Sequence, residues 1–171
     1  EGGIEKMLHY MKWHRKVGIL GPQLIYEDST IQDSYRKFPG ITDVVFKRTF
    51  LVKLPLSRKR LARYLMHGKN SEKTERVDWI VGAFLMIRKK ALDQVGGFDP
   101  RFFLFFEDTD LCRRMGEKGW KVVYFPKAKA THHHQRLSGG SFSQALKKKT
   151  FRVHLASGMK YFWKYLGRRR P

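Results

Sequence analysis

The segment VDWIVGAFLMIRKKALDQVGGFDPRFFLFFEDTDLCRRMGEKGWKVVYFP, residues 77–126, carries the clearest alternation of apolar and polar runs in the chain. Apolar runs rich in β-branched side chains predict buried strands, and runs that end at glycine predict helices. The predicted elements are a strand over 77–89, a helix over 89–97, a helix over 107–119 and a strand over 120–126 that stops at Pro126. Strands that alternate with helices indicate a layered α/β fold.

The sequence before this segment extends the same pattern. Residues 1–16 place apolar side chains at helical spacing and cations near the C-terminal end, which predicts a helix. Residues 17–26 are apolar and predict a buried strand, broken at Gly21-Pro22. We therefore expect a sheet flanked by helices.

The C-terminal part, residues 142–171, differs from the rest and is predicted to be a basic amphipathic helical tail on a domain formed by residues 1–141. The side chains at helical spacing that form its predicted apolar stripe are Phe151, Leu155, Met159, Phe162 and Leu166. Two interpretations remain open: a terminal helix packed on the domain with a solvated basic face, or a helix attached to a membrane surface.

Composition narrows the class of protein. The chain has 171 residues, of which 42% are hydrophobic, so it is long enough to form a core. Its net charge of +21 predicts an anionic partner: nucleic acid, anionic lipid or a phosphorylated substrate. The longest apolar run, 79–87, falls short of the ~20 residues that span a bilayer, no signal peptide opens the sequence, and the single Cys112 fits a reducing compartment.

An apolar run of phenylalanines leads directly into the acidic residues Glu107, Asp108 and Asp110. Acids in a first helical turn are ordinary, because the free N–H groups there favour negative charge. A carboxylate at the edge of a buried segment can instead have a raised pKa and act as a general base. Asp108 and Asp110 also form a D-x-D pattern suited to Mg²⁺ or Mn²⁺, although residues two apart on a helix point to different faces. A helix cap, a base and a metal site all remain open.

His132 and the two histidines after it follow the end of a predicted strand, which raises the prospect of a metal ligand. Zinc is disfavoured because Cys112 has no cysteine partner at ligand spacing. The sequence contains no G-x-S-x-G, Walker-type or Rossmann glycine motif.

Four motifs occur in a fixed order: G-A, G-G-F-D, F-F-x-x-x-E-D-x-D-L and P-x-A-x-x-x-H. Together with the upstream segment VGILGPQLIYEDSTIQDSYRKFP, this set closely resembles the second half of bacterial family 2 glycosyltransferases, over roughly residues 17–134. The rhamnosyltransferase-like members that build cell-surface polysaccharide are the most similar. The resemblance implies a partial GT-A-like mixed sheet flanked by helices, and inverting transfer from a nucleotide sugar.

The resemblance also implies roles for particular residues. Asp108 matches the family's catalytic base, with Glu107 beside it as a supporting group. The positions implied to bind or approach substrate are Trp79, Gly82, Ala83, Asp110 and Arg114. Arg114 is expected to pair with Asp110 across one helical turn. His132 matches a family histidine that is a candidate third ligand of the metal on the donor diphosphate.

The resemblance begins inside the fold, so the nucleotide-binding half and its metal motif are expected outside this chain. A parent enzyme would use a divalent metal, Mg²⁺ or Mn²⁺, a nucleotide-sugar donor and a glycan or lipid-linked acceptor. It would work in the cytoplasm, on the inner face of an anionic membrane, and nucleic acid is disfavoured as a partner. The alternative hypothesis is a non-catalytic module that binds anions or a membrane surface.

Overall fold

The computed structural model describes residues 2–41, 55–66, 71–133 and 149–171. Its central element is a sheet of strand order β3-β6-β1-β5. The strands are β1 (Val17–Ile25), β3 (Glu75–Val77), β5 (Met86–Ile87) and β6 (Lys121–Thr131). β1 and β6 run parallel, whereas β5 and β3 pair with them antiparallel, so the sheet is mixed. A second, two-stranded sheet pairs β2 (Tyr35–Arg36) with β4 (Trp79–Ile80).

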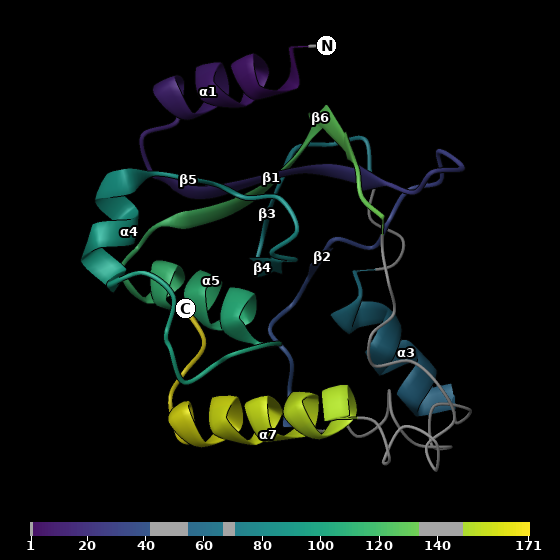
Figure 1. Cartoon of the computed structure of the whole chain (residues 1–171), viewed down its shortest axis with the longest axis vertical. Coiled ribbons are helices and arrows are strands. Elements are labelled where there is room, and N and C mark those ends of the chain that lie inside the picture. Colours follow the sequence, from purple (N-terminus) through teal and green to yellow (C-terminus); the bar gives the residue numbers. More distant parts are fainter. Residues whose placement is uncertain (1, 42–54, 67–70, 134–148) are drawn as a thin grey trace.

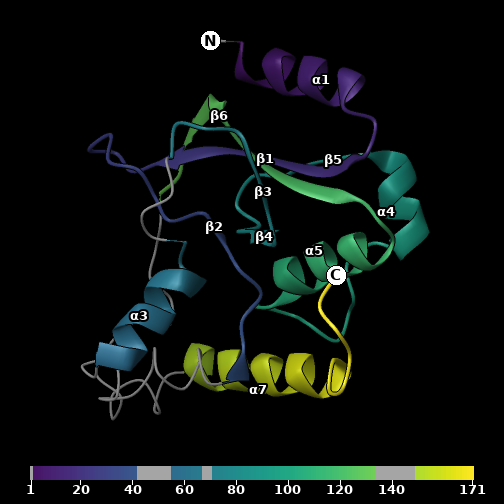
Figure 2. The same cartoon turned by 180° about the vertical axis from the view of Figure 1, so that it is seen from behind.

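Helices cover both faces of the main sheet (Figure 1). α1 (Gly3–Trp13) lies on one face, and α5 (Glu107–Glu117) lies on the other with α4 (Lys89–Val95) beside it. α7 (Lys149–Lys164) forms a further layer on the far side of α5, and both views show it there (Figures 1 and 2). The remaining helix, α3 (Pro55–Tyr64), lies beside the sheet near β2. The predicted α/β fold with a mixed sheet flanked by helices is confirmed.

The alternation of side chains along β6 builds two cores. Val122 and Tyr124 pack on the α5 side, in a cluster that includes Leu111 of α5. Val123 and Phe125 pack on the α1 side. Successive side chains of a strand point to opposite faces, so one apolar strand serves both layers.

The predicted break at Gly21-Pro22 is an irregularity within one strand, whereas the predicted strand end at Pro126 was wrong. β1 continues past Gly21-Pro22, and β6 continues past Pro126 to Thr131. The register explains this, because Pro22 opposes Phe125 whereas the next residue, Gln23, opposes Lys129. The ladder is irregular where both prolines lie, and a proline that lacks an N–H is tolerated at such an irregularity.

The single strand predicted over 77–89 was also wrong. The segment forms the three short strands β3, β4 and β5, which pair with different partners. Asp78 separates the first two, and its carboxylate accepts a hydrogen bond from the Phe38 N–H at 2.8 Å. A turn at Gly82 and Ala83 separates the second from the third. An apolar run specifies burial but not where the chain changes direction.

α7 packs on the domain through only part of its predicted stripe, namely Phe151 and the half-buried Phe162. The residues of α7 and its following turn that are buried are Phe151, Ser157, Gly158, Tyr161 and Tyr165. Of the predicted stripe, Leu155, Met159 and Leu166 are 49%, 61% and 68% exposed. Tyr161 and Tyr165 pack their rings against Phe102 and Phe106. Because tyrosine is amphipathic, the spacing of the more apolar side chains alone did not predict that this face would be buried. The first residues of the predicted tail, 142–148, lie outside the described part of the chain.

Candidate active site

The acids Glu107 and Asp108 open α5, directly after a distorted turn. Phe105 and Phe106 have φ values of 66° and 67°, in the left-handed region that side chains rarely adopt. Phe106 occupies the N-cap position, and no side chain caps the helix there. Neither acid is the N-cap residue, although both lie in the first turn and Asp108 accepts a hydrogen bond from the Thr109 N–H there. Backbone strain of this kind is maintained only where surrounding contacts hold it, and it concentrates at functional sites.

Contacts with α7 hold this turn in place. The Phe106 ring lies 5.2 Å from the ring of Tyr161 and 5.5 Å from that of His154, measured between centroids. Ser157 donates a hydrogen bond to the Leu104 carbonyl at 2.8 Å. The absence of a side chain at Gly158 leaves room for the Phe106 ring, since a Cβ there would lie 3.3 Å from it. The C-terminal helix thus positions the residue that immediately precedes the two acids.

The Asp108 carboxylate is held at both of its oxygens. Its Oδ2 accepts a hydrogen bond from the Gly82 N–H at 2.9 Å, and its Oδ1 accepts one from the Thr109 N–H at 2.6 Å. Burial raises the pKa of this carboxyl group, although both hydrogen bonds and the charge of Arg36 act in the opposite direction. The net result is a carboxylate of raised basicity with a fixed orientation, which are two requirements of a general base.

Glu107 lies beside it in a different environment. Burial is the main cause that raises the pKa of Glu107, and the neighbouring charge of Asp108 adds to it. Its Oε2 is buried and has no hydrogen-bond partner among the described residues. Two adjacent carboxyl groups with raised pKa values are unusual for a purely structural helix start and typical of a functional site.

The predicted substrate positions Gly82 and Ala83 lie on an exposed turn. A Cβ at Gly82 would lie 3.4 Å from the Cβ of Asp108, an ordinary van der Waals contact, so the turn packs directly against the Asp108 side chain. Trp79, by contrast, is buried at 6% exposure, and its indole N–H donates to the Lys37 carbonyl at 2.9 Å. The turn beside Asp108 is exposed at Gly82 and Ala83, whereas Trp79 belongs to the core.

Arg36 is a candidate that the sequence analysis missed. Its guanidinium lies over the Trp79 ring at 5.2 Å, and its charge opposes the raised pKa of Asp108. Its Nε is buried and has no hydrogen-bond partner in the described part of the chain. Arg36 lies on β2, far from Asp108 in sequence, so only the pairing of β2 with β4 brings it near. No local motif could have indicated it.

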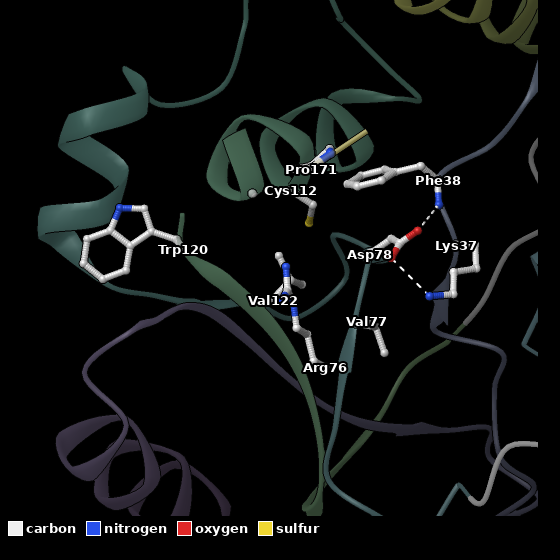
Figure 3. Close-up of a pocket in the computed structure, with 10 residues that line it drawn as sticks. Lys37, Phe38, Arg76, Val77, Asp78, Cys112, Trp120, Val122 and Pro171 are labelled. Atoms are coloured by element: carbon white, nitrogen blue, oxygen red, sulfur yellow. Dashed lines mark hydrogen bonds and ion pairs between the residues drawn. The ribbon is translucent and has the colours of Figure 1, made fainter. Parts of the chain in front are cut away.

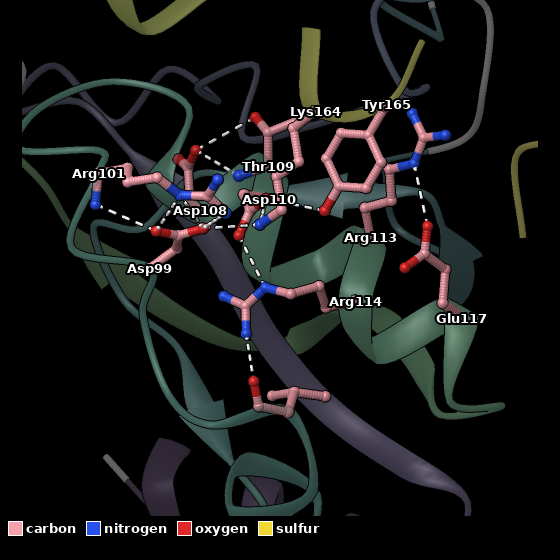
Figure 4. Close-up of polar contacts among 11 residues, drawn as sticks. Asp99, Arg101, Asp108, Thr109, Asp110, Arg113, Arg114, Glu117, Lys164 and Tyr165 are labelled. Carbon is pink, nitrogen blue, oxygen red and sulfur yellow. Dashed lines mark hydrogen bonds and ion pairs between the residues drawn. The ribbon is translucent and has the colours of Figure 1, made fainter. Parts of the chain in front are cut away.

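Asp110 faces away from Asp108, into a network that joins α5 to α7 (Figure 4). It is fully buried. Its Oδ1 accepts hydrogen bonds from Lys164 Nζ at 2.6 Å and from the Tyr165 hydroxyl at 2.8 Å, and its Oδ2 accepts one from Arg114 Nε at 2.7 Å. The predicted Arg114–Asp110 pair across one turn is confirmed. Asp108 and Asp110 therefore cannot chelate one metal together, as their spacing on a helix predicted.

The same network reaches the turn before α5. Lys164 also contacts Asp99 at 2.8 Å, and Asp99 binds Arg101 through both of its oxygens (Figure 4). These contacts, led by the hydrogen bond with Arg101, hold the pKa of Asp99 far below its usual range. The network fixes α7 against α5 and leaves Asp110 and Arg114 with structural contacts, while their predicted role toward substrate stays a prediction.

His132 lies at the end of β6, where its Nδ1 is 2.9 Å from the side-chain oxygen of Gln32. Gln32 in turn donates to the His132 carbonyl at 2.6 Å. Among the residues that the structure describes, no three histidine, cysteine, aspartate or glutamate side chains converge as a metal site would require. These residues therefore do not fit the divalent metal by themselves.

A cavity of ≈ 300 Å³ lies at the other end of α5 from the two acids (Figure 3). α5 contributes Cys112 and Gly116 to its wall, and the C-terminal Pro171 contributes to it as well. Neither Glu107 nor Asp108 lines this cavity. It is thus separate from the candidate active site.

Residues 4–152 match a family described as glycosyltransferase like family 2, and the chain belongs to this family. The sequence resemblance is thereby confirmed. The chain is similar to an N-acetylglucosaminyl-diphospho-decaprenol L-rhamnosyltransferase of Mycobacterium tuberculosis, at 32% identity over 81% of this chain and 44% of that protein. It is also similar to the rhamnosyltransferase WbbL of Escherichia coli K12, at 31% identity over 75% of this chain and 43% of that protein.

A more distant relative is the O-antigen biosynthesis protein RfbC of Myxococcus xanthus, at 25% identity over 69% of this chain and 9% of that protein. The chain spans less than half the length of each of these relatives. All three names concern rhamnosyl transfer or polysaccharide biosynthesis, in agreement with the rhamnosyltransferase-like resemblance.

Proposed function

We propose that this chain forms the acceptor side, with the catalytic base, of an inverting glycosyltransferase. The observation that carries the proposal is the Asp108 carboxylate, which is oriented by the Gly82 N–H beside an exposed turn and has a pKa raised by burial. Membership of the glycosyltransferase like family 2 supports the reaction class.

The chemistry follows from this geometry. Asp108 takes the proton of an acceptor hydroxyl while that oxygen attacks the anomeric carbon of the donor sugar. The new C–O bond forms as the bond from that carbon to the nucleotide diphosphate breaks, so the configuration inverts. Burial raises the pKa of Asp108, and a more basic carboxylate is a stronger acceptor for the proton of the hydroxyl. Glu107 supports the base and the acceptor.

The donor in this proposal is a nucleotide sugar, with rhamnose as the transferred sugar. The acceptor is a lipid-linked or glycan hydroxyl of cell-surface polysaccharide. The names of the relatives from Mycobacterium tuberculosis and Escherichia coli support rhamnose as the transferred sugar, and the name of the first supports a lipid-linked acceptor. The reaction takes place in the cytoplasm, on the inner face of the membrane.

A divalent metal would neutralise the donor diphosphate, and His132 is the residue of this chain proposed to approach it. No step is assigned to the metal, since the described residues do not converge on one. Arg36 provides a positive charge on the same side as Asp108, and we propose that it orients the acceptor or the departing phosphate. Its position over the Trp79 ring supports a positioning role.

The test is Asp108→Asn in the enzyme that contains this chain. We expect transfer to fall by about a hundred- to ten-thousand-fold, because the amide cannot accept the proton. Binding of the nucleotide sugar, measured by calorimetry, should change by less than about threefold. Asp93→Asn, the same change on the exposed face of α4, is the matched control and should leave transfer intact. Normal turnover by Asp108→Asn would refute the assignment of the base.

A non-catalytic anion-binding module remains the rival function. It is favoured by the high positive charge, but it gives no reason for two adjacent carboxyl groups with raised pKa values. Transfer activity that depends on Asp108 would discriminate between the two, since the rival predicts none.

A further inference from the structure

The outward face of α7 carries an apolar stripe that the fold leaves uncovered. The stripe consists of Leu155, Met159, Trp163 and Leu166, which are 49%, 61%, 82% and 68% exposed. Their spacing of four, four and three residues places all of them on one side of the helix. The opposite side packs on the domain through Gly158 and Tyr161. α7 is therefore apolar on two faces, of which the core uses only one.

Cations flank the uncovered stripe along α7, and the helix itself carries no anion. Lys149, Arg152 and Lys160 lie beside it along the helix, and Arg168–Arg170 follow its end; all are exposed. No aspartate or glutamate occurs after Glu117 in the chain. A stripe of large apolar side chains bordered by Lys and Arg is the arrangement that binds at the surface of an anionic bilayer.

We propose that α7 docks this chain on an anionic lipid membrane, with the stripe inserted among the headgroups and the flanking cations on lipid phosphates. Trp163 is the most exposed member, and tryptophan prefers the boundary between headgroups and acyl chains. No helix in the described ranges is both long and apolar enough to cross a bilayer. The contact is thus made from one side, by a helix that lies in the plane of the surface.

A second copy of the chain fits the stripe less well. Two identical stripes in contact would bring their flanking cations together on chains that each carry a charge of +21. Nucleic acid fits less well too, because it would offer phosphates to the cations but no apolar surface to Leu155 and Met159. Of these three occupants, the lipid surface is the one that complements both the charge and the apolar side chains.

The position of the stripe deepens the proposed function, on which this part rests. Tyr161, on the inner side of α7, contacts Phe106, and Phe106 precedes Glu107 and Asp108 in the chain. The membrane would therefore lie one helix layer away from the proposed base, on the α7 side of the molecule (Figure 1). Phe103, which is 90% exposed, belongs to a turn whose carbonyls at Arg101 and Leu104 accept hydrogen bonds from α7.

Vesicle flotation tests the proposal. The 171-residue chain should float with vesicles of phosphatidylglycerol and phosphatidylcholine, and remain unbound with phosphatidylcholine alone. Added salt should weaken binding, because the cations contribute to it. The double variant Met159→Ser/Trp163→Ser should bind the anionic vesicles at least roughly tenfold more weakly. Trp13→Ser removes a tryptophan that is 70% exposed on α1, and as the matched control it should bind like the original chain.

Three results would overturn the proposal. They are equal binding to neutral and anionic vesicles, undiminished binding by the double variant, and a dimer in gel filtration that the double variant abolishes. Circular dichroism checks that the variants keep their helix content. Asp108→Asn separates this inference from the proposed function, since it should bind vesicles normally while losing transfer. Failure of the unaltered chain to bind anionic vesicles, with transfer by the parent enzyme intact, would refute the membrane proposal alone.

Discussion

Asp110→Asn should destabilise the fold more than any surface charge change, because Asp110 joins α5 to α7. Its two oxygens accept hydrogen bonds from Lys164, Tyr165 and Arg114 at 2.6–2.8 Å, and the residue is fully buried. The side chains of Lys164 and Arg114 are only 14% and 16% exposed. Removing the anion leaves two largely buried cations with less compensation.

The magnitude follows from that burial. Removal of one partner from a buried ion pair costs about 3–5 kcal/mol, because the other charge stays desolvated. Lys164 keeps its contact with Asp99 at 2.8 Å, and the asparagine oxygen still accepts one hydrogen bond. We therefore expect the lower end, about 3 kcal/mol. With a urea m-value of about 2 kcal/mol/M, the unfolding midpoint should fall by about 1.5 M.

Equilibrium urea unfolding, followed by circular dichroism, measures the effect. Asp93→Asn is the control, because Asp93 pairs with Lys89 on an exposed helix face and such pairs contribute about 0.3–0.5 kcal/mol. A double-mutant cycle with Lys164→Met should give a coupling energy of about 1–3 kcal/mol. A loss below about 1 kcal/mol for Asp110→Asn, or additive effects in the cycle, would refute the reasoning.

Three further predictions concern the site. Glu107→Gln should stabilise the fold more at about pH 7.5 than at about pH 5. Burial raises the pKa of Glu107 in the folded state, so the folded protein loses stability as the pH rises through that pKa and Glu107 ionises. Glutamine does not ionise and removes this loss. Urea unfolding at both pH values checks this, and an equal effect at both would contradict it. Gly158→Val should crowd the Phe106 ring and cost about 1–3 kcal/mol, with a lower kcat because Phe106 precedes the acids; full retention of both would count against the support assigned to α7. Arg36→Gln removes a charge that opposes the raised pKa of Asp108, so the acid limb of the pH–rate profile should move to higher pH; an unchanged limb would show that Arg36 does not act on the base.

Local sequence was sufficient for elements whose ends carry their own signals. α4 ends at Gly96 in the left-handed conformation, and α5 begins in acids and gives way to Gly119, as predicted. The candidate base was also accessible from sequence, through the E-D motif after a phenylalanine run. The strained turn at Phe105-Phe106 was not, since bulky side chains give no local indication of a positive φ.

Other features depend on contacts between distant parts of the chain. The proline positions in β1 and β6 are compatible with strands only because they meet at one irregularity of the shared ladder. Arg36 approaches Asp108 only through the pairing of β2 with β4. Neither the proline irregularity nor the approach of Arg36 to Asp108 can be predicted from a short stretch of sequence.

The sequence by itself determined the class of fold, the family and the carboxylates that carry the proposed chemistry, because these depend on local patterns and on motifs in order. Only the tertiary structure decided how the two neighbouring acids Asp108 and Asp110 divide their tasks. Asp108 accepts a hydrogen bond from the Gly82 N–H at an exposed turn. Asp110 accepts one from Lys164, on a helix more than fifty residues away in sequence. It also decided which face of α7 is buried, since packing selects between two apolar faces that the helical period alone cannot distinguish.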